Sequence, residues 1–198
     1  MLIDDLLKKI NLSEGHRGYY MFETFILNLL KVHLEKSNKP FISQPRRIGF
    51  DGYAPEGIDD IKGGTQVEIK FNLERMPLRR LLEQAIHLQT KIFDNEPFEN
   101  LLFITPNPIS TKYREYFYSK FQEEKPPFKI LVWGPEDVNK IVSKNRKEAN
   151  EIANNLFSLR IESAVVQSSK DWKKELEEKI ELLNRFYKKG QFSLFLGA

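Results

Sequence analysis

The chain of 198 residues contains no cysteine, which excludes a disulfide scaffold, a thiolate zinc site and a cysteine nucleophile. Only three histidines are present, and no two are close enough for an HxH or HxxxH metal motif. No stretch approaches the roughly 18 consecutive apolar residues of a membrane helix. The N-terminus, MLIDDLLKKI, lacks the basic start and continuous apolar core of a secretory signal. We therefore expect a cytoplasmic protein with no membrane partner.

The residues that are abundant describe a folded protein of mildly basic charge. Apolar residues make up 40% and charged residues 30%, which is globular rather than disordered composition. The 31 Lys and Arg against 28 Asp and Glu give a net charge of +3, which permits a polyanionic partner without requiring one. The length allows one ordinary domain and a short extra segment.

Hydrophobic periodicity predicts an α/β domain with a mixed sheet flanked by helices. After a short helix at 1–14, the expected elements are a helix at 19–36, strands near 41–42, 48–54 and 65–71, a helix at 77–94, a strand at 101–105, a helix at 110–122, a strand at 128–133 and a helix from 136 to about 153. The turn formers between 55 and 64 predict an exposed hairpin loop. Residues 154–169 lose clear periodicity, and a helix resumes at Asp171.

The strand at 65–71 carries the residues that point to chemistry. Glu68 and Lys70 are two residues apart, so they share one face of an otherwise apolar strand. Burying either charge alone is costly, and a divalent cation offers one solution, bound by Asp51, Glu68 and the Ile69 carbonyl. A metal-bound water can attack a phosphodiester, and Lys70 is placed to position or deprotonate that water or to stabilise charge on the phosphorus.

Simpler structural explanations exist for the same residues. Glu68 and Lys70 can form an ion pair on a solvated sheet face, and Asp51 can cap the turn at Gly52. Asp59 and Asp60 read as solvated loop acids. Asp59 is also the substitute ligand if Asp51 does not serve, since it too precedes the strand.

The spacing of Asp51 and the Glu68-Ile69-Lys70 triplet resembles the PD-(D/E)XK nuclease superfamily, and within it the Mrr-like restriction endonuclease domains. Phe50 stands where the superfamily name has proline. The resemblance spans roughly residues 15–148. It implies a restriction-endonuclease-like mixed central sheet flanked by helices, Mg²⁺ or Mn²⁺ as cofactor, and DNA as partner.

The same resemblance implies a site role for Glu23, because a helix before the strands often carries a glutamate beside the site. It also implies a homodimer or higher oligomer, since one such site cuts one strand. Basic residues near the constellation are candidates to contact phosphates, or else belong to a solvated charged face. These basic residues are Arg46, Arg47, Lys62, Arg75, Arg79 and Arg80.

We expect the nuclease-like domain to occupy residues 1–150, followed at 151–198 by a linker helix and the truncated first strand of another domain. The segment 191–198, QFSLFLGA, resembles the opening strand of a sirtuin-like NAD-binding domain. That pairing implies a fragment of a larger bacterial anti-phage defence protein.

The leading hypothesis is a metal-dependent endonuclease domain that hydrolyses DNA, with Asp51, Glu68 and Lys70 as its catalytic residues. One alternative is a catalytically silent nuclease-fold module that serves as a nucleic-acid sensor or an oligomerisation platform. Another is an interaction domain whose acids and bases are surface charge only, which predicts no metal binding.

Overall fold

A computed structural model of the chain describes residues 16–43, 50–71, 73, 80, 83, 87, 98–124 and 126–188. The chain divides into two compact units, Met1–Ala153 and Asn154–Ala198, which are treated separately below. The helix 1–14, most of the helix 77–94 and the strand segment 191–198 expected from the sequence lie outside the described residues.

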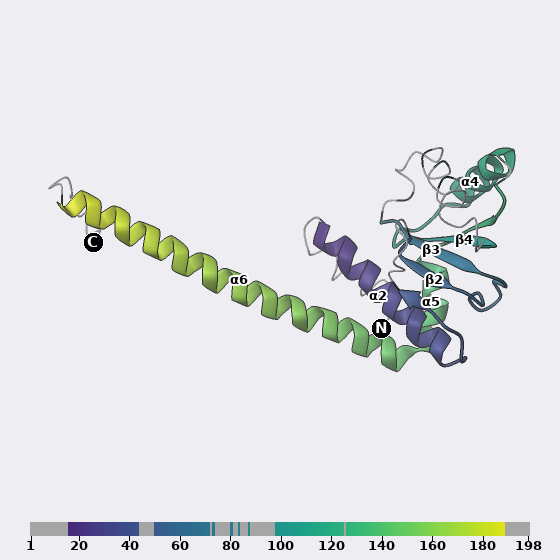
Figure 1. The fold of residues 1–198 in the computed structure, drawn as a ribbon, viewed down its shortest axis with the longest axis horizontal. Coiled ribbons are helices and arrows are strands. Elements are labelled where there is room, and N and C mark those ends of the chain that lie inside the picture. The colour runs from purple at the N-terminus through teal and green to yellow at the C-terminus, as the bar shows by residue number, and fades with distance from the viewer. Residues whose placement is uncertain are drawn as a thin grey trace. The chain divides into compact units, whose positions relative to one another are not determined.

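The described part of the first unit is an α/β fold built on one mixed sheet, as the sequence predicts (Figure 1). The sheet order is β1-β2-β3-β4-β5. The first two pairings, β1 with β2 and β2 with β3, are antiparallel, while β3, β4 and β5 run parallel. The strands are β1 (Ile42–Ser43), β2 (Gly52–Ala54), β3 (Thr65–Ile69), β4 (Asn100–Ile104) and β5 (Lys129–Trp133).

Helices cover both faces of this sheet (Figure 1). They are α2 (His16–Glu35), α4 (Thr111–Glu124) and α5 (Pro135–Lys144), and α6 (Arg146–Lys188) follows α5 in the chain. The helix α2 contacts α5, and it contributes a fully buried apolar stripe that includes Phe22, Phe25 and Leu29. On the α4 face, Phe103 of β4 packs edge-on against Phe117 of α4.

The register of the sheet fixes which face each side chain occupies. Glu68 pairs with Phe103 across β3 and β4, and Phe103 pairs with Val132 across β4 and β5. Paired residues in a sheet point to the same side, so Glu68 lies on the α4 face with the phenylalanine cluster. Val67 and Ile69 therefore lie on the opposite face.

Three details differ from the sequence-based expectation. The strand expected at 48–54 begins at Gly52, so Asp51 directly precedes β2. The loop 55–64 is not wholly exposed, because Ile58 is fully buried and pairs with Ile61 in an isolated bridge. Residues 154–169 do not interrupt the helix, since α6 is continuous from Arg146 to Lys188.

The junction between β5 and α5 follows the sequence closely. Gly134 ends the strand and caps the helix, and Pro135 occupies the first helical position, where its missing N–H has no cost. The Asp137 carboxylate accepts a hydrogen bond from the Gly134 N–H at 3.2 Å. This turn directs α5 back across the sheet.

The second unit is described as the continuation of α6 to Lys188. Several of its large apolar side chains, among them Trp172, Ile180 and Leu183, are about half exposed or more. None of the described helices combines the length and apolarity that crossing a membrane requires.

Candidate metal and catalytic centre

The candidate site forms where β3 extends beyond its short neighbour β2. The Asp51 N–H donates to the Val67 carbonyl at 3.1 Å, and the Asp51 Oδ2 accepts a hydrogen bond from the Ile69 N–H at 2.6 Å. The Asp51 side chain thus accepts a hydrogen bond from β3 that the backbone of a longer β2 would otherwise accept. It does not cap a turn at Gly52, so that alternative is wrong.

Glycine at position 52 lets the chain enter β2 at this point. A Cβ added there would lie 2.6 Å from the ring of Phe41, closer than real Cβ contacts allow. Gly52 pairs with Val67 in the antiparallel ladder, so Asp51 directly precedes the paired residues, and its charge interacts with that of Glu68.

Glu68 and Lys70 form a direct ion pair at the end of β3. The Glu68 side chain is only 9% exposed and that of Lys70 is 23% exposed, so the pair is not on a solvated face. The Lys70 N–H donates to the Ile104 carbonyl at 2.9 Å, which holds the backbone of Lys70 against β4. The ion pair expected from the structural alternative exists, but in a largely buried place.

Helix α2 adds two side chains from one of its faces, Tyr19 and Glu23, four residues apart. The Tyr19 hydroxyl donates to the Ile69 carbonyl at 3.0 Å. Glu23 interacts electrostatically with Asp51, Lys70 and Tyr19. The structure therefore brings Glu23 to the neighbourhood of Asp51 and Glu68.

Burial raises the proton affinity of every carboxylate in this cluster. The pKa of Glu68 rises to about 7, mainly by desolvation, and the nearby Lys70 offsets this only in part. Desolvation also raises the pKa of Asp51, although the Ile69 N–H and Lys70 act in the opposite direction. The pKa of Glu23 is raised by burial and by the charge of Asp51. One lysine does not compensate three acids here.

The donor atoms suit a hard divalent cation. Asp51 and Glu68 offer carboxylate oxygens, and Ile69, the residue after Glu68, offers a backbone carbonyl while its N–H donates to Asp51. Each carboxylate has lone pairs beyond the single hydrogen bond or ion pair given for it, so Asp51 and Glu68 would still have the capacity to hold a cation. Among the described residues no group of three or more His, Cys, Asp or Glu lies close enough to hold a metal ion, so Glu23 is not a third ligand in this arrangement.

The sequence analysis did not single out Tyr19 or Gln66, which also belong to this region. Gln66 lies two residues before Glu68 on the same face of β3. It is 1% exposed, and its Oε1 is buried with no hydrogen-bond partner. The alternation of Gln66, Glu68 and Lys70 in the strand could have identified Gln66, whereas a tyrosine that bonds to a main-chain carbonyl leaves no pattern in the sequence.

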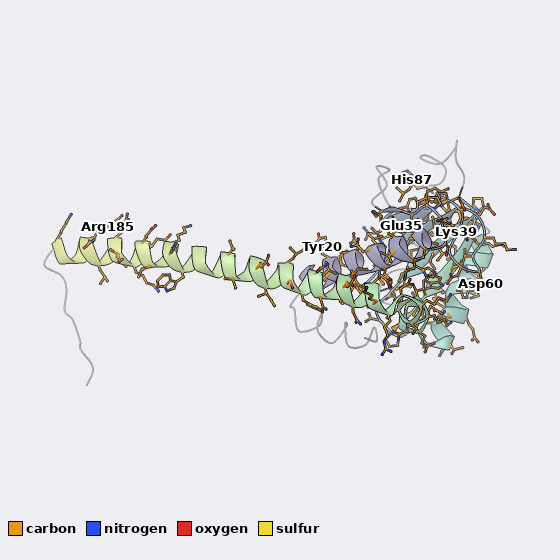
Figure 2. The ribbon with its side chains drawn as sticks, turned by 90° about the horizontal axis from the view of Figure 1, so that it is seen from below. Tyr20, Glu35, Lys39, Asp60, His87 and Arg185 are labelled. Atoms are coloured by element: carbon orange, nitrogen blue, oxygen red, sulfur yellow. The ribbon has the colours of Figure 1, made fainter. Side chains whose placement is uncertain are left out.

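The candidate phosphate-binding residues are only partly described. Arg46, Arg47, Arg75 and Arg79 lie outside the described residues. Lys62 is exposed and precedes β3, at the opposite end of that strand from Glu68, so it is not part of the cluster. Arg80 is helical and exposed, as is His87 (Figure 2).

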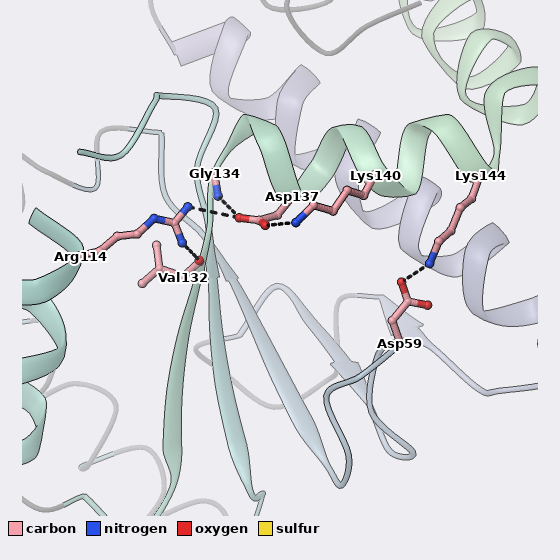
Figure 3. Close-up of polar contacts among 7 residues, drawn as sticks. All are labelled: Asp59, Arg114, Val132, Gly134, Asp137, Lys140 and Lys144. Atoms are coloured by element: carbon pink, nitrogen blue, oxygen red, sulfur yellow. Dashed lines mark hydrogen bonds and ion pairs between the residues drawn. The ribbon is translucent and has the colours of Figure 1, made fainter. Parts of the chain in front are cut away.

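Asp59 belongs to a separate polar cluster and does not replace Asp51. Its carboxylate accepts a hydrogen bond from His33 Nε2 at 2.8 Å. It also accepts one from Lys144 Nζ at 2.9 Å, which Figure 3 shows. Despite partial burial, these two partners lower the pKa of Asp59. Asp59 is therefore an exposed loop acid that is also paired, and Asp60 is exposed as well (Figure 2).

The chain was compared with protein-family models, curated proteins and solved structures, and none of them matches it.

Proposed function

We propose that the first unit is a metal-dependent endonuclease domain that hydrolyses phosphodiester bonds of DNA. The observation that carries this proposal is the convergence of Asp51, Glu68 and Lys70 at the end of β3, with the acids at raised pKa. Buried acids with perturbed pKa values beside a cation are more frequent at functional sites than elsewhere.

Each residue has a role in this proposal. Asp51, Glu68 and the Ile69 carbonyl would hold Mg²⁺ or Mn²⁺, and a bound ion would supply Lewis acidity and a water of lowered pKa. The Lys70 side chain is 23% exposed, so its ammonium would be able to reach the scissile phosphate and stabilise the negative charge that develops there. Hydrolysis adds water across one P–O bond and yields a phosphate monoester and a free hydroxyl.

The main alternative is a nuclease-fold module without catalysis, acting as a nucleic-acid sensor or an oligomerisation platform. The direct Glu68–Lys70 ion pair favours it, because the pair satisfies both side chains without a cation. The raised pKa of Glu68 speaks against it, since this pairing leaves the acid poorly stabilised as a carboxylate.

Cleavage of supercoiled plasmid in Mg²⁺ or Mn²⁺ separates these functions. We expect the wild-type chain to nick or linearise the plasmid, and Lys70→Ala to lose this activity. Lys144→Ala is the matched control, because Lys144 pairs with Asp59 in the other cluster, and it should cut like the wild type. Equal cutting by wild type and Lys70→Ala would identify a contaminating nuclease. No cutting, together with no Mn²⁺ binding, would favour the interaction module.

The wider context remains a set of predictions from the sequence. These are the homodimer or higher oligomer, the sirtuin-like NAD-binding continuation and the role in anti-phage defence. The segment that carries the sirtuin-like resemblance, residues 191–198, lies outside the described residues.

A further inference from the structure

The hydroxyl of Tyr19 connects α2 to the residue at the centre of the candidate site. It donates a hydrogen bond of 3.0 Å to the carbonyl of Ile69, fifty positions away in the chain. The N–H of the same residue donates to Asp51 Oδ2 at 2.6 Å. Both polar groups of the Ile69 backbone are therefore held by side chains rather than by a neighbouring strand.

Tyr19 lies beside three acids, Asp51, Glu23 and Glu68. A phenol hydroxyl can donate one hydrogen bond. The single hydroxyl proton of Tyr19 has two neighbouring acceptors, the Ile69 carbonyl and the Glu23 carboxylate.

Ile69 lies between Glu68 and Lys70, so the orientation of its peptide groups determines where those two side chains project. A hydrogen bond to its carbonyl fixes that orientation and leaves the second lone pair of the oxygen for another partner. Groups one step removed from a metal commonly orient the ligands in this way.

We propose that Tyr19 is a positioning residue of the candidate site, whose hydroxyl aligns the Ile69 carbonyl with the Asp51 and Glu68 carboxylates for binding of a divalent cation. This inference rests on the proposed function, since it assigns Tyr19 to the same cation site. Tyr19 does not touch the reacting atoms. Its contribution is to the affinity for the cation rather than to the chemical step.

The test is Tyr19→Phe, which removes only the hydroxyl. Tyr20→Phe is the matched control, because Tyr20 is the next residue on the same helix and its side chain is 64% exposed (Figure 2). Two quantities are measured for each variant: the Kd for Mn²⁺ by calorimetry without DNA, and the Mn²⁺ concentration that gives half-maximal nicking of plasmid. Thermal unfolding confirms that each variant is folded before the comparison.

We expect Tyr19→Phe to raise both quantities about tenfold, which is the usual scale for an outer-shell partner of a metal ligand. The maximal nicking rate at saturating Mn²⁺ should stay within about threefold of wild type, and Tyr20→Phe should leave both quantities unchanged. A purely structural role would not separate the metal requirement from the maximal rate.

The outcomes distinguish this inference from the proposed function. If the wild type binds Mn²⁺ and cuts DNA, and Tyr19→Phe behaves like Tyr20→Phe, the role of Tyr19 is wrong and the nuclease stands. If Tyr19→Phe weakens Mn²⁺ binding but the wild type cuts no DNA, the nuclease is wrong and the role of Tyr19 stands. Absence of Mn²⁺ binding in the wild type would overturn both.

Discussion

Two groups of acids in the first unit have opposite electrostatic character. Asp59 and Asp137 each meet two cationic or potentially cationic side chains, and the pKa of each is lowered (Figure 3). Asp51 and Glu68 share the single cation Lys70 among the described residues, and the pKa of each is raised. The first group is already satisfied by the fold, whereas the second has unused capacity for positive charge.

The contacts of Asp137 show what a satisfied acid does in this protein. It accepts hydrogen bonds from Arg114 at 3.2 Å, from the Gly134 N–H at 3.2 Å and from Lys140 at 3.0 Å (Figure 3). Arg114 also donates to the carbonyl of Val132 at 2.9 Å, so this cluster ties α4 to β5 and to the start of α5. Such a network explains stability and needs no ligand. Asp59 and Asp137 therefore have a structural role, while the chemical role of Asp51 and Glu68 stays a proposal.

The largest expected difference between the groups is in catalysis. Asp51→Asn should lower the nicking rate at least about 100-fold, because it removes a charge at the site while keeping an oxygen that can accept from the Ile69 N–H. Asp59→Asn should change the rate less than about twofold. Plasmid nicking under saturating Mn²⁺ measures both. Equal losses in the two variants would contradict the division of roles.

The next difference is in the sign of the pH dependence of stability. The pKa of Glu68 is raised from 4.5 to about 7 in the folded protein, so its contribution is fully present below pH 4.5 and is lost as pH rises through 7. A shift of this size corresponds to about 3 kcal/mol of unfolding free energy. Glu68→Gln should lack this decline, as urea unfolding at a series of pH values would show.

Asp59 is an internal control, because its contribution gives the pH dependence of stability the opposite sign. Because its pKa is lowered, its contribution is present above its ordinary value of 3.8 and is lost as pH falls through the lowered folded value. Asp59→Asn should therefore alter the stability profile only at the acid end.

Superimposable profiles for wild type and Glu68→Gln between pH 4.5 and about 7.5 would argue against the raised pKa of Glu68.

A smaller effect, on the unfolding free energy, is expected when Asp59 is replaced. Asp59→Ala leaves the Nε2–H of buried His33 without its acceptor, which should lower the unfolding free energy by about 1–3 kcal/mol. Asp59→Asn should cost less, because asparagine can still accept this hydrogen bond and tolerates the positive φ of 47° at this position. Urea unfolding measures both variants. Equal losses would show that the hydrogen bond to His33 contributes nothing.

The smallest expected effect is at the exposed edge of the Asp137 cluster. Lys140 is 73% exposed, so Lys140→Met should change the unfolding free energy by less than about 0.5 kcal/mol. Arg114→Met should cost more, about 1–2 kcal/mol, because Arg114 also bonds to the Val132 carbonyl. The same urea titrations would rank the two variants, and a reversed order would contradict this reading of the cluster.

The sequence predicts the elements whose physical signals are strong. The apolar runs at β4 and β5 predict strands; β4 is buried on both faces, whereas β5 is fully buried on one face only. Gly134-Pro135 marks the end of one strand and the start of a helix. The burial of Ile58 could not be predicted, because turn formers surround it. The continuity of α6 through residues 154–169 could not be predicted either, because the apolar residues of this segment form no periodic stripe.

The candidate site was predictable only in part. The spacing of Asp51, Glu68 and Lys70 is sufficient to expect them together, because strand alternation and antiparallel pairing are regular. The structure brings them together, while their chemical roles stay predictions. The bond from Tyr19 to the Ile69 carbonyl depends on how α2 packs against the sheet, which one sequence does not reveal.

The most direct test of the account is calorimetric titration of Mn²⁺ into wild type, Glu68→Gln and Asp59→Asn. Glu68→Gln removes one acid from the group whose pKa values are raised. Asp59→Asn removes one acid from the group whose pKa values are lowered. The account predicts that wild type and Asp59→Asn bind with the same affinity, and that Glu68→Gln loses binding. Equal binding by Glu68→Gln and the wild type, or no binding by the wild type, would contradict it.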